Sequence, residues 1–170
     1  MLSMMSNAHV YLAIAEGALA ESKRLDEATR IPRPGAQPGF VVTYDPEHTS
    51  FKQSLIAIVF AGIYLEALLY MVGVGQLGKD EYMKIDRKYY EEKLQALGVT
   101  DIETLATCKR FREARNDLAH EKAIEPLTID GTAFRTAQRE AEIAVSFVRS
   151  IVGLLQAPLT LAAADASRRR

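Results

Sequence analysis

The sequence predicts an all-α protein, a single-domain antiparallel bundle of about five helices, and three observations lead to this class. Several long segments repeat their apolar residues at helical spacing. Prolines and glycines gather in short stretches between those segments, where one helix ends and the next begins. The segment of strand character, residues 40–44, has no evident partner strand.

Size and charge narrow the class further. A chain of 170 residues buries enough surface to fold as one domain without disulfides or metals. Its net charge of −1 argues against a broadly basic nucleic-acid binder, so any phosphate contact must come from a local cluster, and no DNA partner is expected. Cys108 is the only cysteine, which favours a reducing compartment. The predicted localisation is cytoplasmic, with no signal peptide at the start of the sequence.

In the first half of the chain, prolines and glycines separate the predicted helices. Residues 6–29 form the first predicted helix, and residues 30–40, with three prolines and two glycines, end it. Asp45 followed by Pro46 suits the start of the second helix, as N-cap and first-turn proline. A third helix is expected over residues 86–97, before Gly98.

The second helix contains the apolar run from Leu55 to Gly75, which is long enough to cross a bilayer. Glu66 is its single charge, and an unpaired carboxylate at mid-bilayer costs roughly 2.5 kcal/mol or more. The other predicted helices are amphipathic and need a partner to cover their apolar faces. A soluble bundle with this helix at its centre is therefore favoured over a membrane anchor.

The second half supplies two more helices. Thr100 and Glu103 have capping-box spacing and open a fourth helix that runs to about His120. Residues 132–155 form the fifth, with one apolar stripe. The predicted domain is 1–157, and residues 158–170, which contain Pro158 and end in Arg168–Arg170, form a flexible tail.

The fourth helix has an unusual apolar face. At about 100° per residue, one arc gathers Ile102, Leu105, Cys108, Phe111, Leu118 and Ala119. Arg112 and Arg115 fall inside this arc, where a charge is costly unless it is paired or used. Each arginine could pair with a buried carboxylate, Glu66 being the obvious candidate, or keep its charged head in water. Alternatively, the guanidinium groups form an anion site that binds phosphate.

The end of this helix reads "RNDLAH", residues 115–120. This stretch resembles the signature of the HEPN family (higher eukaryote and prokaryote nucleotide-binding domains), an arginine, a polar residue and a histidine a few residues later. Arg115, Asn116 and His120 match those positions. The arrangement of about five helices, with the motif before the last long one, is also similar to the family.

The resemblance implies a metal-independent endoribonuclease, often a toxin or antiphage factor, that needs no cofactor and cleaves RNA by attack of the ribose 2′-hydroxyl. His120 would transfer protons, Arg115 would hold the scissile phosphate, and Asn116 would orient one of them. Arg112 and Lys122 would add RNA contacts. A single copy of the motif supplies one histidine for two proton transfers, so a homodimer is expected to bring two copies together.

The alternative function is a non-catalytic binding or dimerisation module that docks a nucleotidyltransferase or another partner. Some HEPN proteins pair with a nucleotidyltransferase-like antitoxin that modifies a tyrosine two residues after the histidine. Lys122 occupies that position here, so this modification is excluded, although an antitoxin that only binds is not.

Overall fold

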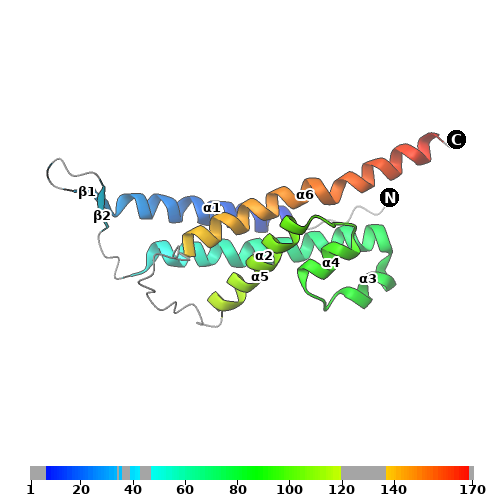
Figure 1. The fold of residues 1–170 in the computed structure, drawn as a ribbon, viewed down its shortest axis with the longest axis horizontal. Coiled ribbons are helices and arrows are strands. Elements are labelled where there is room, and N and C mark those ends of the chain that lie inside the picture. Colours follow the sequence, from blue (N-terminus) through cyan, green and yellow to red (C-terminus); the bar gives the residue numbers. More distant parts are fainter. Residues whose placement is uncertain (1–6, 34, 36–38, 43–46, 120–136, 169–170) are drawn as a thin grey trace.

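The computed structural model describes residues 7–33, 35, 39–42, 47–119 and 137–168, and within them the predicted all-α bundle is confirmed. The helices are α1 (Ala8–Ala28), α2 (Thr49–Leu77), α3 (Lys79–Ile85), α4 (Tyr90–Ala96), α5 (Ile102–Ala119) and α6 (Ala137–Arg168). Figure 1 shows α1, α2 and α6 running side by side along the longest dimension, with α3, α4 and α5 against one end and side of α2.

Helix α2 is the centre of the bundle and contacts each of the other five. Its most deeply buried side chains include Ile58, Leu65 and Leu69, which are fully inaccessible to solvent. Among the described residues α2 is the one helix long and apolar enough to cross a membrane, and half of its most apolar window is buried inside the bundle. A core helix of a soluble protein has the same length and composition.

A short hairpin corrects the expectation that residues 40–44 lack a partner strand. Strand β1 (Arg30–Pro32) pairs in antiparallel register with β2 (Phe40–Val42), with Ile31 opposite Val41. Strand β1 has too few residues to show an alternating pattern, and it ends in a proline. Both strands of a two-stranded ribbon are edge strands, and a proline, which has no backbone N–H to donate, is tolerated on an edge strand.

The region after α2 also differs from the prediction of one helix over residues 86–97. Gly78, at φ +83°, ends α2, and the two short helices α3 and α4 follow. The Glu92 carboxylate accepts a hydrogen bond from the Tyr89 backbone N–H at 3.0 Å and so fixes the start of α4. Gly98, at φ +90°, lies just beyond α4 as predicted.

Two helix ends lie elsewhere than expected. Helix α2 begins at Thr49 rather than at Pro46, which lies outside the described residues. Helix α6 continues through Pro158 to Arg168, and its end projects beyond the other helices (Figure 1). A proline removes one backbone hydrogen bond, whereas residues 159–168 are rich in alanine and leucine, which favour helix. The predicted tail is therefore helical to Arg168, and the domain boundary at 157 stays a prediction.

Two glycines of α2 receive large side chains from α3 and α5. A Cβ at Gly62 would lie 2.8 Å from both Cδ and Nε of Arg115, on α5. A Cβ at Gly73 would lie 2.1 Å from Cδ2 of Tyr82, a fully buried residue of α3. Both distances are too short for any residue with a side chain, so α3 and α5 approach α2 closely because these positions are glycine.

Candidate active site

Arg115 reaches from α5 across to α2. Its side chain is 28% exposed and lies over Gly62. Nη1 donates a hydrogen bond to Glu66 Oε1 at 2.9 Å and a second one to the hydroxyl of Tyr90. No described residue accepts a hydrogen bond from Nη2 of Arg115, so one edge of the guanidinium stays open within this part of the chain.

Tyr90 completes a three-residue network that joins α2, α4 and α5. Its hydroxyl donates to Glu66 Oε1 at 2.5 Å, while its ring is buried and stacks on Phe111, with 6.3 Å between centroids. Burial, and secondarily the hydrogen bond to Glu66, raises the pKa of Tyr90 well above its ordinary value. The hydroxyl therefore stays protonated and acts as a fixed donor to the carboxylate.

The two carboxylate oxygens of Glu66 differ in their surroundings. Oε1 accepts the hydrogen bonds from Tyr90 and Arg115. Oε2 accepts none from any described residue, and the side chain is 47% exposed. Oε1 is thus held in place, while Oε2 has no hydrogen-bond donor among the described residues and remains able to accept one.

Arg112 has a different environment from Arg115. Its Nε and Nη2 bind the carboxylate of Glu91 on α4, with the shortest distance 2.8 Å, and both side chains are 18% exposed. The guanidinium also lies 4.3 Å from the ring centroid of Tyr89. The paired donors and the stacked face leave little of Arg112 free for a phosphate.

In the structure, both arginines on the apolar arc of α5 pair with carboxylates. This is the first of the three explanations offered for their position. Glu66 is the partner of Arg115 as predicted, but it is half-exposed rather than buried. Glu91, the partner of Arg112, was not anticipated from the sequence. Three carboxylates, those of Glu66, Glu91 and Glu113, lie within 4 Å of the two guanidinium groups. A phosphate must therefore compete with Glu66 or approach the edge of Arg115 that no described residue binds.

The remaining residues of the motif lie at the end of α5. Asn116 is exposed, about 100° around the helix from Arg115, and no described residue binds its side chain. Helix α5 is described to Ala119. His120 and Lys122 lie outside the described residues, so their predicted roles are neither supported nor contradicted.

Cys108 lies one turn of helix before Arg112 and is fully buried, as expected for a core residue. Burial, with a smaller contribution from the nearby Glu91 carboxylate, raises the pKa of its thiol to about 12. At neutral pH the thiol is protonated and out of reach of solvent, which excludes a nucleophilic role.

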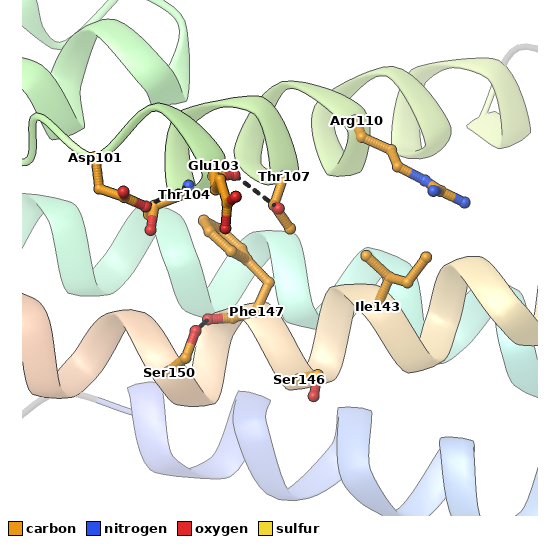
Figure 2. A pocket seen from close by; sticks show the side chains of 9 residues that line it. All are labelled: Asp101, Glu103, Thr104, Thr107, Arg110, Ile143, Ser146, Phe147 and Ser150. Carbon is orange, nitrogen blue, oxygen red and sulfur yellow. Dashed lines mark hydrogen bonds between the residues drawn. The ribbon is translucent and has the colours of Figure 1, made fainter.

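Arg110 binds the buried Glu140 of α6 through Nε and Nη2, the shorter distance being 2.5 Å. It lines an open groove of about 520 Å³ between α5 and α6 (Figure 2). The groove is lined by Asp101, Glu103, Thr104, Thr107, Arg110, Ile143, Ser146, Phe147 and Ser150. Figure 2 shows the carboxylates of Asp101 and Glu103 at one end and Arg110 at the other.

This groove is separate from the Arg115 network. Arg110 precedes Arg115 by five residues, which places the two arginines about 140° apart around α5. Thr107 and Ser150 direct their hydroxyls to backbone carbonyls of their own helices, so these groups are already satisfied. The described lining of the groove has two carboxylates, Asp101 and Glu103, and one basic residue, Arg110, which is paired with Glu140, so its charge disfavours an RNA phosphate.

Within the described ranges, no three histidine, cysteine, aspartate or glutamate side chains are grouped to hold a metal ion. Comparison with known proteins identifies no relatives, because no family model, no curated protein and no solved structure matches the chain. The likeness to the HEPN family therefore rests on the motif and the order of helices.

Proposed function

We propose that the protein is a metal-independent endoribonuclease whose site contains Arg115, Asn116 and His120. The observation that carries the proposal is the environment of Arg115. A half-buried guanidinium is fixed by α2 and α4, has one edge that no described residue binds, and lies five residues before His120 in the sequence. A toxin or antiphage role follows from the HEPN resemblance alone.

The proposed reaction needs few groups. A base takes the proton of the ribose 2′-hydroxyl, the 2′-oxygen attacks the adjacent phosphorus, and an acid protonates the leaving 5′-oxygen. The open edge of Arg115 binds a phosphate oxygen and stabilises the charge that develops on the phosphorane. His120 transfers one of the protons, and the products carry a 2′,3′-cyclic phosphate and a 5′-hydroxyl.

We also propose that the protein acts as a homodimer, and an exposed stripe on α2 supports this. Ile56, Tyr70 and Leu77 are each 36–38% exposed, and the half-buried Ile63 completes a spacing of seven residues. Apolar residues repeated every seven positions suit packing against a second helix. Glu66 lies on the same flank of α2, so a partner on this stripe would lie beside the Arg115 network.

The second candidate function, a non-catalytic binding module for a nucleotidyltransferase or other protein, is favoured by a different observation. Both arginines of the site pair with carboxylates within the chain, and Arg112 uses both Nε and Nη2 for its pair with Glu91. A purely structural network would look the same, and the exposed stripe would then serve to dock a partner.

The experiment that separates the two functions is RNA cleavage by the purified protein in excess chelator. Wild type is compared with Arg115→Ala, His120→Ala and the control Arg149→Ala, which removes an exposed arginine that pairs with Glu16 at 2.6 Å on other helices. Thermal unfolding and molar mass in solution establish that each variant is folded and has the same oligomeric state.

For a nuclease, cleavage survives the chelator, the 3′ ends carry cyclic phosphate, and activity falls by at least ~100-fold in the two motif variants but not in Arg149→Ala. An inert wild-type protein, tested on tRNA, mRNA and ribosomal RNA, favours the binding module. Equal cleavage by all four proteins contradicts the site.

A further inference from the structure

We propose that Glu66 is the base that takes the 2′-hydroxyl proton, and that Tyr90 is the residue that positions it. This inference rests on the proposed ribonuclease function and deepens it, because none of the three residues that match the motif is a carboxylate and the motif assigns Glu66 no role.

The first argument is proximity to the phosphate-binding group. In RNA the attacking 2′-oxygen is separated from the phosphorus by the ribose C2′, C3′ and O3′ atoms, so a base for it must lie close to whichever side chain holds the phosphate. Glu66 Oε1 lies 2.9 Å from Nη1 of Arg115, and Glu66 is the carboxylate that contacts Arg115 among the described residues. A phosphate on the free edge of Arg115 would have this carboxylate beside it.

The second argument is the way the carboxylate is held. Tyr90 is 7% exposed, and its hydroxyl anchors Oε1 from a fixed direction. Oε2 has no donor among the described residues, and nearly half of the Glu66 side chain is exposed. A positioned carboxylate with one oxygen that has no donor among the described residues meets the requirement for a general base, and Glu66→Gln distinguishes this role from a purely structural one.

The step balances within the chain. Glu66 accepts the proton from the 2′-hydroxyl as the 2′-oxygen forms its bond to phosphorus. The bond from phosphorus to the 5′-oxygen breaks, and the leaving oxygen takes a proton from the imidazolium of His120. Exchange with water then removes the proton from Glu66 and returns one to His120, so no further reactant is needed.

One consequence concerns the homodimer. If histidine is both the base and the acid, two chains are needed, because each copy of the motif has one histidine. With Glu66 as the base, a single chain contains both groups, and dimerisation then serves to cover the α2 stripe and not to complete the acid–base pair.

The variant Glu66→Gln separates the role of base from that of a counter-ion, because the two roles have opposite effects on substrate binding and turnover. Removing a negative charge beside Arg115 strengthens phosphate binding, so KM for RNA decreases. Removing the base lowers kcat by roughly 100- to 10,000-fold. A residue that only supports the fold produces no such split between KM and kcat.

A substrate with a different leaving group shows whether a variant has lost the base or the acid. A nucleoside 3′-(4-nitrophenyl phosphate) releases nitrophenolate, which needs no acid. On this substrate His120→Ala recovers most of its lost rate, whereas Glu66→Gln loses the same factor as on RNA.

Glu16→Gln is the matched control, since Glu16 also pairs with an arginine of another helix, Arg149, and is partly exposed. It should leave KM and kcat unchanged. Glu66→Asp keeps a shortened carboxylate and should retain more activity than Glu66→Gln. All variants are compared for melting temperature so that misfolding is detected.

If wild type cleaves RNA and Glu66→Gln has an equal or higher kcat, Glu66 is only a counter-ion and the inference is overturned, while the nuclease proposal stands. If wild type cleaves no RNA, the nuclease proposal fails and takes the role of Glu66 with it. A lowered kcat that is rescued by the nitrophenyl leaving group makes Glu66 the acid and not the base, which also overturns the inference.

Discussion

Glu66 and Arg115 are 49 positions apart in the chain, yet Oε1 of one and Nη1 of the other lie 2.9 Å apart. The contact depends on Gly62, one turn before Glu66 on α2, because the Arg115 side chain crosses the helix where a Cβ is missing. The position of the motif arginine is thus set by α2 and not by α5 alone.

Gly62→Ala tests whether the hydrogen bonds of Arg115 to Glu66 and Tyr90 can be lost while the protein stays folded. The new Cβ would lie 2.8 Å from Cδ and Nε of Arg115, so this side chain must move and lose its hydrogen bonds to Glu66 and Tyr90. Alanine favours helix over glycine by about 1 kcal/mol, which offsets part of this loss, so the free energy of unfolding in urea should change by no more than about 2 kcal/mol. RNA cleavage should fall at least ~10-fold as Arg115 leaves Glu66 and Tyr90.

Gly17→Ala is the control for that variant, because nothing lies within 4 Å of a Cβ at Gly17. It should gain up to about 1 kcal/mol in unfolding free energy and show unchanged cleavage. Normal cleavage by Gly62→Ala would mean that the position of Arg115 over α2 is irrelevant to the reaction.

Gly73→Ala should have the opposite effect on stability. Its Cβ would lie 2.1 Å from Cδ2 of Tyr82, a fully buried ring that cannot swing into solvent. Overpacking of this kind typically costs about 1–3 kcal/mol, measured as the loss of unfolding free energy in urea. Adding Tyr82→Leu should recover part of the loss, and equal stability of the single and double variants would argue against the clash.

The protein should lose stability at alkaline pH. Burial raises the pKa of Cys108 from 9.0 to about 12, and burial also raises the pKa of Tyr82 from 10.0 to about 12. Because the unfolded chain releases these protons first, their contribution is complete below about pH 9 and is lost as the pH rises towards 12. Between about pH 8 and 10.5, Cys108 alone accounts for a decrease on the order of 2 kcal/mol.

Urea unfolding of wild type and Cys108→Ala at both pH values measures this contribution. The variant is less stable at pH 8 because of its cavity, but its stability should fall less on going to the higher pH. Parallel decreases in the two proteins would show that the thiol does not contribute.

Arg112 is expected to matter more for stability than for RNA affinity. Its Nε and Nη2 are bound to Glu91, so Arg112→Ala leaves a largely buried carboxylate unpaired and should cost about 1–3 kcal/mol in urea unfolding. Glu91→Gln and the double variant complete a cycle that gives the coupling energy of the pair. Weaker RNA binding by Arg112→Ala with no loss of stability would restore the RNA-binding role predicted from the sequence.

The sequence contains enough information for the helical bundle and for one partner of the site. Glu66 is the single charge in the apolar run of α2, so it stands out as the partner of an arginine on an apolar arc. Glu91 does not stand out as the partner of Arg112, because the direction of its side chain depends on where α4 begins. That start is fixed by the Glu92 cap and by the packing of α4 against α5. The same limit hides the pair between Arg110 and Glu140, two polar residues whose helices meet only in three dimensions.

Short secondary-structure elements cannot be predicted from the sequence for a related reason. Strand β1 has three residues, too few for any periodic pattern, and exists because β2 lies opposite. Tyr90 is also unremarkable in the sequence, and its part in the network becomes evident only when its buried hydroxyl is found between Glu66 and Arg115.

Gly62 and Gly73 are eleven positions apart, about three turns of helix, so they open on the same side of α2. Inserting or deleting one residue between them rotates one site by about 100° relative to the other, and α3 and α5 could no longer both dock. Related chains should therefore keep a constant length between these two positions. Variation in length should fall instead in the connection between β1 and β2, where an added residue changes no helix packing.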